Sequence, residues 1–429
     1  MITTLNSYNR LWACLRPVLP VYLGWRSWRV KEDKTRRGER LARAWQADRP
    51  EGVLIWLHAV SVGEAVAAVS LARACLDQHP SAHVLITTNT VTALDRLAHI
   101  QPARCLSCYQ PLDDAACVDR FLGFWQPDAA VFLESDFWPN LVIQTAKAGI
   151  PVTFASSQLS DTAYENWQRR PVLAGELFGA ARLICAVDDH QRKRFEQLCQ
   201  ASSKPLPEIR TIGSLKLNAA GLPVDKAYVK AIMTAADNRA VVLAASTHEP
   251  EEKLVSAVSA DLAAQGHPHL LIIAPRHLDR AETIASHMPT ARRRSQGAVP
   301  HKEDHIFLAD SFGELGSLIT AADVVILGGS FAPKGGHNPL EIAAFGKPVV
   351  TGPSQFKNQA EFDKLHQIGQ CITAQHQDDL KVQLASWLVQ RENKGRLLDQ
   401  AVSEQAKAYV TKACERPAKT AQLILDMLR

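Results

Sequence analysis

The sequence lacks a hydrophobic run long enough to cross a membrane. Near the N-terminus the longest charge-free apolar piece is PVLPVYLGW (Pro17–Trp25), whereas a spanning helix needs about 20 apolar residues. The first residues also lack a compact apolar segment followed by a small-residue cleavage site, which a secretory signal peptide would show. We therefore expect neither a spanning helix nor a signal peptide.

The chain also lacks the local signatures of several enzyme and metal-site classes. It contains no G-x-x-x-x-G-K-[ST] phosphate loop and no G-x-S-x-G nucleophile turn. Its nine cysteines are scattered, and Cys105 and Cys108 have no second C-x-x-C pair with which to bind zinc. We expect reduced thiols in a cytosolic protein and no metal site. Two other spacings suggest metal ligands but fall in expected loops or helix caps: His301 with His305, and His337 with Glu341.

The charge of the chain is weak overall but unevenly distributed. A formal net charge of +4 over 429 residues gives no argument for nucleic-acid binding. Between Met1 and Trp45, however, ten Arg or Lys side chains face only three acidic ones, and aromatic residues alternate with the arginines: Trp12, Tyr22, Trp25 and Trp28. Such a mixture favours a membrane interface. The alternative is a first helix that packs on its own domain and shows a solvated basic face.

Apolar, β-type runs alternate with helical patterns along the whole chain. Its length of 429 residues predicts two or three domains, because single cores rarely grow beyond about 250 residues. Most runs are continuously apolar, which is typical of parallel strands covered by helices on both faces. The expected strands are Val53–Ala59, Val84–Thr88, Ala129–Leu133, Pro151–Ala155, Leu183–Ala186, Ile209–Ile212, Val241–Ala245, Leu270–Ala274, His305–Ala309, Val324–Leu327 and Pro348–Thr351.

Helical patterns lie between these strands, so we predict an α/β protein with two doubly wound, Rossmann-like domains that face each other across a cleft. The polar stretch Cys199–Gly213 marks the break between them. The predicted order is a membrane-interface segment (1–39), an N-terminal Rossmann-like domain (40–207), and a C-terminal Rossmann-like domain with C-terminal helices (208–429). The expected helices are Glu64–Leu76, Asp114–Gly123, Asp189–Leu198, Glu251–Gln265, Gly313–Ala322 and Asn338–Ala344.

Polar and charged side chains directly follow the expected strands, where open α/β sheets bind their ligands. VSVGE ends in Glu64, ESDFWPN begins with Glu134, and GSLKLN contains Lys216. STHEPEE, PRH and GGSFAPKGGHNPLE follow later strands. This layout predicts an active site built from strand ends. Glu64 stands at a helix start, so on its position alone it is either an acid that stabilises the helix or a catalytic base.

The most specific local element is KGGHNPLEIAAFGKPVVTGP (Lys334–Pro353). Two glycines permit close backbone approach, Asn338 stands at an expected N-cap, and Glu341 follows three residues later. A helix start with a neighbouring lysine is suited to phosphate. The alternative is a well-capped core helix in which Glu341 only completes a capping box.

Six motifs occur in the order typical of the 3-deoxy-D-manno-octulosonic acid (Kdo) transferase family, which the chain resembles from about Arg40 to Lys364. They are HAVSVGE, FLESDFWPNL, IGSLKLN, AASTHEPEE, LLIIAPRHLDR, and FGELGSLITAADVVILGGSF with the KGGHNPLEIAAFGKPVV that follows it. The resemblance implies a GT-B glycosyltransferase of Gram-negative lipopolysaccharide synthesis. It implies transfer of Kdo from CMP-Kdo to a lipid A precursor (lipid IVA), with inversion, at the cytoplasmic face of the inner membrane. It also implies that the domain 40–207 binds the acceptor and the domain 208–429 binds the CMP-sugar donor.

The resemblance also implies roles for individual residues. Glu64 is similar to the general base, and Glu134 and Lys216 match groups that stabilise the transition state. The family pattern has no metal, and CMP-Kdo is a co-substrate rather than a cofactor. The positions that match CMP-binding residues are Pro275, Arg276, Phe312, Gly313, Glu314, Asn338, Pro339, Leu340 and Glu341.

Four departures from the family pattern bear on the acceptor and the donor loops. The usual TPTGSER is TVTALDR (Thr90–Arg96), and ARLS is SQLS with Gln158 in place of Arg. Phe312 replaces the Met of MGE, and Lys334 replaces an Arg. The first two changes leave the acceptor and the number of Kdo units open. A related transferase with another acceptor or another CMP-activated acidic sugar is therefore an alternative, as is a non-catalytic protein of the membrane surface.

Overall fold

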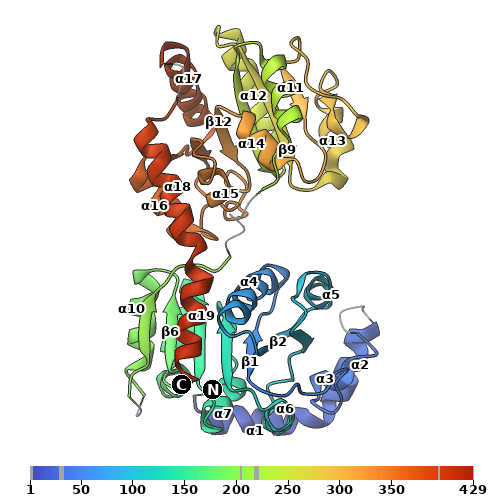
Figure 1. Ribbon diagram of the computed structural model, residues 1–429, viewed down its shortest axis with the longest axis vertical. Helices are drawn as coiled ribbons and strands as arrows, with labels where there is room; N and C mark the ends of the chain where they lie inside the picture. The colour runs from blue at the N-terminus through green and yellow to red at the C-terminus, as the bar shows by residue number, and fades with distance from the viewer. Residues whose placement is uncertain (1–2, 29–32, 203–204, 217–221, 395–396, 429) are drawn as a thin grey trace. The chain divides into compact units, whose positions relative to one another are not determined.

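The computed structural model describes residues 3–28, 33–202, 205–216, 222–394 and 397–428, which belong to two compact units (Figure 1). Unit 1 comprises Met1–Lys216 and Glu415–Arg429, and unit 2 comprises Leu217–Cys414. Each unit contains a seven-stranded sheet in which all assigned strand pairs are parallel. The prediction of two doubly wound α/β domains is confirmed.

The sheet of unit 1 has the strand order β3-β2-β1-β4-β5-β6-β7. In this order the chain fills one side of β1 and then the other, so the direction of winding reverses between β1 and β4. The strands are β1 (Leu54–His58), β2 (His83–Thr88), β3 (Cys105–Tyr109), β4 (Ala129–Leu133), β5 (Val152–Ser157), β6 (Leu183–Ala186) and β7 (Glu208–Thr211).

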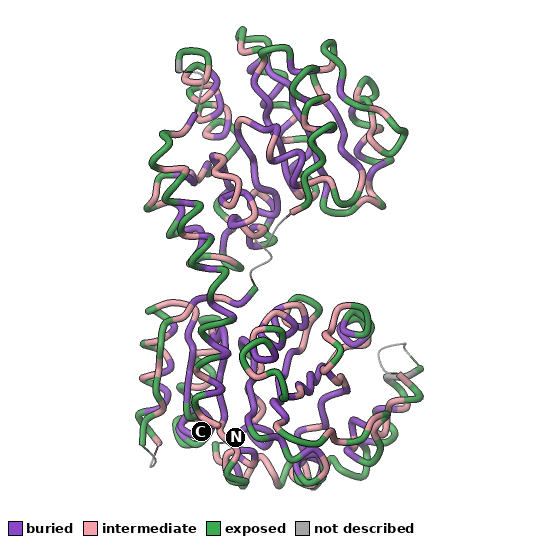
Figure 2. The backbone as a smooth tube through the Cα atoms, in the orientation of Figure 1, coloured by how far each residue is buried: buried purple, intermediate pink, exposed green. Residues whose placement is uncertain are grey.

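Helices cover both faces of this sheet because successive strand residues point to opposite sides. Trp56 and Phe132 pack with α6, α7, α9 and α10 on one face, and Leu57 and Val131 pack with α4, α5 and α19 on the other. Figure 2 shows the buried strands between partly exposed helices. The helices of unit 1 are α1 (Leu5–Leu15), α2 (Leu19–Trp28), α3 (Arg37–Arg40), α4 (Val62–Gln78), α5 (Val91–Ile100), α6 (Ala115–Trp125), α7 (Pro139–Lys147), α8 (Asp161–Gln168), α9 (Pro171–Phe178), α10 (Asp189–Cys199) and α19 (Arg416–Asp426).

The sheet of unit 2 has the order β10-β11-β9-β8-β12-β13-β14, and its winding reverses between β8 and β12. Its strands are β8 (Ala240–Thr247), β9 (His269–Pro275), β10 (Arg292–Arg293), β11 (Ile306–Leu308), β12 (Val324–Leu327), β13 (Val349–Thr351) and β14 (Cys371–Thr373). Its helices are α11 (Lys226–Ala236), α12 (Glu251–Ala264), α13 (Ala281–Ser286), α14 (Leu315–Ala321), α15 (Leu340–Ala343), α16 (Gln359–Ile368), α17 (Gln377–Lys394) and α18 (Gln400–Cys414). Two apolar clusters again lie on opposite faces of the sheet.

The predicted domain boundary and the predicted place of the last helix need correction, whereas α17 and α18 lie in unit 2 as predicted. The strand expected at the start of the second domain is β7, and it extends the first sheet because Ile209 pairs with Ile184 of β6. The boundary therefore lies after Lys216 rather than after residue 207. The last helix, α19, belongs to unit 1 because Ile424 and Leu425 are buried in the same apolar cluster as α4.

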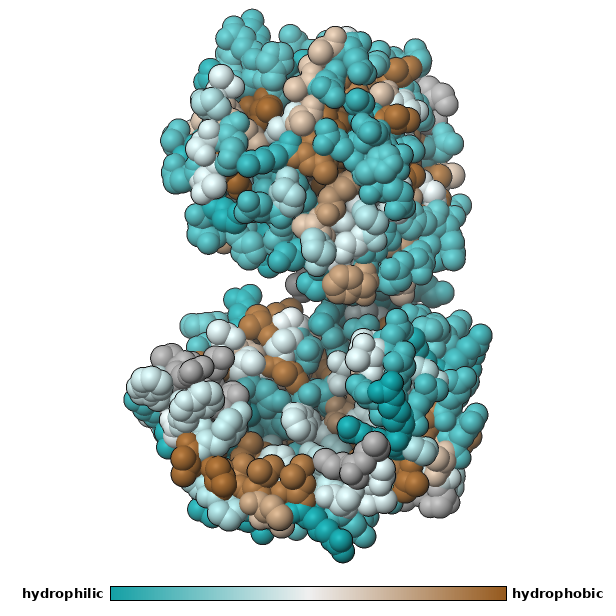
Figure 3. Space-filling model, turned by 180° about the vertical axis from the view of Figure 1, so that it is seen from behind, coloured by the Kyte–Doolittle hydropathy of each residue, from teal (hydrophilic) through white to brown (hydrophobic). Residues whose placement is uncertain are grey.

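The N-terminal segment forms two short helices that pack on unit 1 with one side. The Tyr8 hydroxyl donates to Asp113 at 2.8 Å, and Arg16 pairs with Asp114 at 2.7 Å. Their other side is apolar and exposed, and Figure 3 shows hydrophobic side chains gathered along this edge of unit 1. We call these residues the apolar strip: Leu11, Leu15, Val18, Val21, Tyr22, Trp25 and Trp28. In the described part of the chain no helix has the length and apolar character needed to span a bilayer.

Candidate active site

Glu64 lies in the first turn of α4, directly after β1, and its carboxylate is bound to the turn that precedes it. Ser61 is the N-cap and accepts from the Glu64 backbone N–H at 3.3 Å. In return, Glu64 Oε1 accepts from the Ser61 hydroxyl at 2.9 Å and Oε2 accepts from the Val60 N–H at 2.8 Å. This S-x-x-E arrangement is a variant of the capping box. Since each carboxylate oxygen has two lone pairs, both oxygens can still accept another proton donor.

Glu134 follows β4, next to β1 at the reversal point of the sheet, and is held under strain. Its φ angle is +61°, which side-chain-bearing residues rarely adopt, and its side chain is buried. Oε2 accepts from Lys216 Nζ at 2.5 Å, whereas Oε1 is buried without a hydrogen-bond partner among the described residues. Burial raises the pKa of Glu134, although the Lys216 ammonium opposes this shift.

Lys216 completes a cluster of three charged side chains in unit 1. Its Nζ binds Glu134, and its Cε lies 3.7 Å from the position that a Cβ on Gly63 would take. The neighbouring Glu64 is close enough for its charge to raise the pKa of Glu134, after the larger effects of burial and Lys216. The structure therefore brings together the predicted residues Glu64, Glu134 and Lys216, although they come from three distant parts of the chain.

A buried histidine that the sequence analysis did not single out ties β1 to the segment that carries Glu134. His58 is fully buried, with Nδ1 2.9 Å from Thr87 Oγ1 and Nε2 2.8 Å from Asp136 Oδ2. The Trp138 indole also donates to Asp136 at 2.6 Å. His58 and Asp136 stand inside the motifs HAVSVGE and ESDFWPN, so their motif context was visible in the sequence, but their pairing depends on the neighbouring positions of β1 and β4.

The CMP-binding positions expected from the resemblance lie in unit 2, at the carboxyl ends of β9, β11 and β12. Pro275 ends β9 and is buried, and Arg276 is exposed, with no ion-pair partner among the described residues. Phe312 is 80% exposed, and Gly313 has a φ of +84°. Burial alone would raise the pKa of Glu314, but hydrogen bonds from Arg294, at 2.6 Å, and from Ser311 outweigh it and lower that pKa.

The helix predicted over Asn338–Ala344 is shorter than expected, because α15 is a single turn over Leu340–Ala343. Pro339 is the N-cap of α15, and Asn338 Oδ1 accepts from the Leu340 N–H at 3.1 Å. Glu341 therefore does not complete a capping box with Asn338. A single turn has a much weaker dipole than a long helix, so the start of α15 by itself is a weaker anion site than the sequence predicts.

Glu341 is a half-buried carboxyl group without a hydrogen-bond partner among the described residues. Burial raises its pKa to about 7, and only the charge of Arg276 opposes the shift. This electrostatic contact places the 275–276 and 338–341 segments side by side. Because no described residue binds it, the Glu341 carboxyl group is available to form hydrogen bonds with the hydroxyl groups of a ligand.

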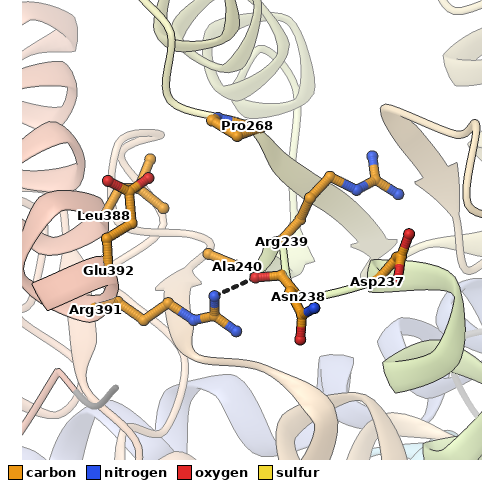
Figure 4. Close-up of a pocket in the computed structure, with 8 residues that line it drawn as sticks. All are labelled: Asp237, Asn238, Arg239, Ala240, Pro268, Leu388, Arg391 and Glu392. Atoms are coloured by element: carbon orange, nitrogen blue, oxygen red, sulfur yellow. Dashed lines mark hydrogen bonds between the residues drawn. The ribbon is translucent and has the colours of Figure 1, made fainter. Parts of the chain in front are cut away.

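A separate cavity in unit 2 lies at the opposite end of the strands, beside the start of β8 (Figure 4). It has a volume of about 220 Å³. Arg239 donates to four backbone carbonyl groups, and Arg391 donates to the Asn238 carbonyl. Both cations that line this cavity are therefore already bound, and its lining, as far as the structure describes it, contains none of the predicted site residues.

Comparisons with known proteins connect these positions to one family. Residues 35–219 match the family model described as 3-deoxy-D-manno-octulosonic-acid transferase (kdotransferase). A probable mitochondrial 3-deoxy-D-manno-octulosonic acid transferase from Arabidopsis thaliana is 31% identical, over 80% of this chain and 78% of the relative. The 3-deoxy-D-manno-octulosonic acid transferase of Bordetella pertussis is 33% identical, over 72% of this chain and 74% of the relative.

Among solved structures, Anabaena HepE in complex with UDP has a TM-score of 0.55 and 16% identity, and the match covers 88% of this chain and 100% of that chain. The UDP-GlcNAc 2-epimerase of Neisseria meningitidis has a TM-score of 0.53 and 13% identity, over 88% of this chain and 99% of that chain. At these identities the likeness shows the fold alone. Two parallel, doubly wound sheets together with these neighbours identify the GT-B fold, as predicted.

Replacing Glu341 by Gln should stabilise the protein at high pH. A carboxyl group whose pKa rises to about 7 on folding binds its proton more tightly in the folded state than in the unfolded state. The folded state therefore loses stability as pH rises from about 4.5 to 7, by up to about 3 kcal/mol. Calorimetry should show a gain in Tm for Glu341→Gln at pH 8 that shrinks as the pH is lowered towards 4.5.

The matched control is Glu314→Gln, which removes a carboxylate whose pKa is lowered on folding. Such a group stabilises the folded state above its unfolded pKa, so this variant should lose stability at pH 8. An equal loss in both variants would contradict the assignment of Glu341 as an uncompensated carboxyl group.

Proposed function

Because the chain belongs to the 3-deoxy-D-manno-octulosonic acid transferase family, we propose that it transfers Kdo from CMP-Kdo to a lipid A precursor, lipid IVA, with inversion at the anomeric carbon. The observation that carries the proposal is the cluster of Glu64, Glu134 and Lys216 at the reversal point of the first sheet. Two carboxylates and an ammonium group at a strand-end site suit proton abstraction and the stabilisation of a charged sugar.

In this proposal Glu64 is the general base. It takes the proton from the acceptor hydroxyl while the acceptor oxygen forms its bond to the anomeric carbon, and the bond from that carbon to the phosphate oxygen breaks. The Ser61 hydroxyl and Val60 N–H fix the orientation of the carboxylate and leave lone pairs for the substrate. Ground-state hydrogen bonds of this kind reduce the rearrangement needed in the transition state.

Glu134 and Lys216 stabilise the charges of the reacting sugar. The Oε1 atom of Glu134, which no described residue binds, is available to face the positive charge that develops as the bond to CMP breaks. Lys216, which already binds Oε2, has two further ammonium protons for the carboxylate of Kdo. The strained backbone and the burial of Glu134 are consistent with this role, since functional sites commonly retain such costs.

The donor nucleotide is assigned to the strand ends of unit 2. Arg276, which has no ion-pair partner among the described residues, supplies a cation for the phosphate, and Glu341 supplies an acceptor for ribose hydroxyl groups. Phe312, Gly313 and Glu314 form a loop anchored by Arg294, with an exposed aromatic ring for the base. No resident metal or other cofactor is part of the proposal.

The apolar strip is proposed to lie on an anionic membrane surface, at the cytoplasmic face of the bacterial inner membrane. Within the strip Val21 is 71% and Trp28 is 76% exposed, whereas exposed apolar residues on soluble proteins are usually scattered singly. Arginines in the same segment suit anionic headgroups. Docking of α1 through Asp113 and Asp114 holds the strip at one edge of unit 1.

A different acceptor is the second candidate, and Gln158 is the observation that favours it. Gln158 follows β5, and its backbone N–H donates to the Glu134 carbonyl at 3.4 Å. Its side chain also lowers the pKa of Glu134, after the larger effects of burial, Lys216 and Glu64. A neutral amide therefore lies directly beside the strained Glu134, where the family pattern has an Arg. A site that has lost one positive charge next to a catalytic carboxylate can favour an acceptor with a different charge.

An acceptor panel tests the proposed function. With CMP-Kdo as donor, we expect CMP release and a Kdo-modified product with the lipid A precursor, detected by mass spectrometry. Transfer to a non-lipid glycan but not to the lipid A precursor would favour the second candidate. CMP release at background level with every acceptor and with CMP-activated acidic sugars would contradict both and leave a non-catalytic protein.

Glu64→Gln should lower turnover by at least ~10²-fold, the scale expected for loss of a general base. The amide oxygen can still accept from the Val60 N–H and the amide nitrogen can donate to the Ser61 hydroxyl, so the melting temperature should change little. Asp188→Asn is the matched control, because Asp188 caps α10 and accepts from the Gln191 N–H at 2.7 Å. That control should keep its turnover, and comparable turnover of Glu64→Gln per folded molecule would make Glu64 a structural cap only.

Replacing Val21, Trp25 and Trp28 together by Ser should weaken binding to anionic vesicles by at least ~10-fold. The variant has less apolar area to transfer from water into the membrane, which lowers the free energy gained on binding. Flotation with phosphatidylglycerol-containing vesicles measures the effect. A control with Met233, Val382 and Val389 replaced by Ser removes exposed apolar side chains of unit 2 and should bind as the wild type does. Equal binding of both triple variants would remove the argument for the strip.

A further inference from the structure

Three histidines gather at the reversal point of the second sheet, outside the positions assigned to CMP. His248 follows β8, His277 follows β9, and His337 belongs to the segment after β12. The Nε2 atoms of His248 and His337 are 2.9 Å apart, and the two rings lie within 10° of parallel. The His277 ring is 5.2 Å from that of His248 and steeply inclined to it, at 68°.

The short Nε2–Nε2 contact requires the two imidazoles to share a proton. One ring donates an N–H and the other accepts with a lone pair, because two lone pairs or two N–H groups would repel each other. The neutral pair then has one N–H and one lone pair left, both on the Nδ1 atoms, which have no partner among the described residues. One added proton turns both Nδ1 atoms into donors and gives the pair one positive charge.

The surroundings of the pair are rich in positive charge. Arg276, Lys334 and Lys357 all act on these histidines, and none has an ion-pair partner within the described ranges. The charge of Arg276 also lowers the pKa of Glu341, which burial raises to about 7.

Two acidic residues are near His248, but their oxygens are occupied. Glu251 accepts from backbone N–H groups, and Glu252 accepts from Thr247 and Arg280. The negative charge of each carboxylate is therefore already shared with other donors, and neither is free to form a full ion pair with a protonated imidazole.

The protonation of the pair follows from these neighbours. Burial, then the charges of His248, Arg276, Lys357 and His277, lower the pKa of His337 to about 4. Burial also lowers the pKa of His248, where Glu251 and Glu252 oppose the effect and His277 and Lys334 add to it. The pair is therefore neutral near pH 7 and lies among cations that would favour a bound anion.

We propose that His248 and His337 form a proton-accepting pair that binds the phosphate monoester dianion of the released nucleotide and takes up one proton as it binds. The inference rests on the proposed function, because that function supplies the nucleoside monophosphate. Two N–H donors and a shared positive charge match two phosphate oxygens. Arg276, Lys334 and Lys357 add charge around the same anion.

The proposed pair also matches the change of charge in the reaction. A sugar nucleotide of this kind is a phosphodiester with one negative charge, and the leaving monoester carries two near neutral pH. A pair that gains a proton as the second charge develops binds the leaving phosphate better than the donor. Such differential binding favours departure of the nucleotide.

Proton uptake during CMP binding tests the inference without a catalytic turnover. Titration calorimetry of the full chain with CMP at pH 7.5, in several buffers of different ionisation enthalpy, gives the number of protons bound with each CMP. At this pH the phosphate is already a dianion, so uptake comes from the protein. We expect about 0.5 to 1 proton for the wild type, and none with cytidine, which lacks the phosphate.

His337→Gln and His248→Gln should each abolish most of the uptake and weaken CMP binding at least ~10-fold, while cytidine binding is unchanged. The matched control is His301→Gln, an exposed histidine of unit 2 that should leave uptake and affinity unchanged. CMP binding without uptake in the wild type overturns the inference but leaves the proposed function intact. If wild-type protein binds neither CMP nor cytidine, the nucleotide assignment fails and the inference fails with it.

Discussion

The strand ends of unit 2 depend on one buried carboxylate, that of Glu251. It accepts five backbone N–H groups, from His248 at 2.8 Å, Gly329 at 2.8 Å, and Ser330, Phe331 and Ala332 at 2.9 to 3.1 Å. These donors come from the segments that follow β8 and β12, so a single charge joins the two strand ends at the reversal point. Without it, buried N–H groups would lose their partner, which costs roughly 1–3 kcal/mol for each group. The loop that runs on to His337 starts from this anchor.

The two units carry different side chains at the same position of their sheets. In the first sheet the reversal point lies between β1 and β4, which lead to Glu64 and Glu134; in the second it lies between β8 and β12, which lead to His248 and His337. Parallel strands on either side of a reversal send their connections to opposite faces, so the space between those connections stays open to ligands. Unit 1 fills it with carboxylates and an ammonium group, whereas unit 2 fills it with imidazoles and cations. The His58–Asp136 contact in one unit and Glu251 in the other join the segments that carry these side chains.

Much of the fold was predictable because buried parallel strands have a simple signature. The predicted strands Ala129–Leu133, Leu183–Ala186 and Val324–Leu327 coincide with β4, β6 and β12, whose residues are apolar on both faces. The edge strands β3, β10 and β14 were missed, because short strands with polar residues, such as the two arginines of β10, lack that signature. The place of α19 was not predictable from the sequence. The apolar residues of an amphipathic helix show that it packs on an apolar surface, but they do not show that this surface is the one beside α4. The charged site residues were found from their positions after strands, but the Glu251 and His248–His337 contacts join loops that are far apart in the sequence.

The packing of α19 against α4 makes unit 2 an insertion within unit 1. The chain enters the second unit after Lys216 and leaves it before Glu415. During synthesis on the ribosome, unit 2 is therefore a continuous segment that can complete its core as soon as it has emerged. Unit 1 has to wait, since the groove beside α4 stays uncovered until the final helix has been made. Unit 1, which holds Glu64, Glu134 and Lys216, is thus begun before unit 2 and completed after it.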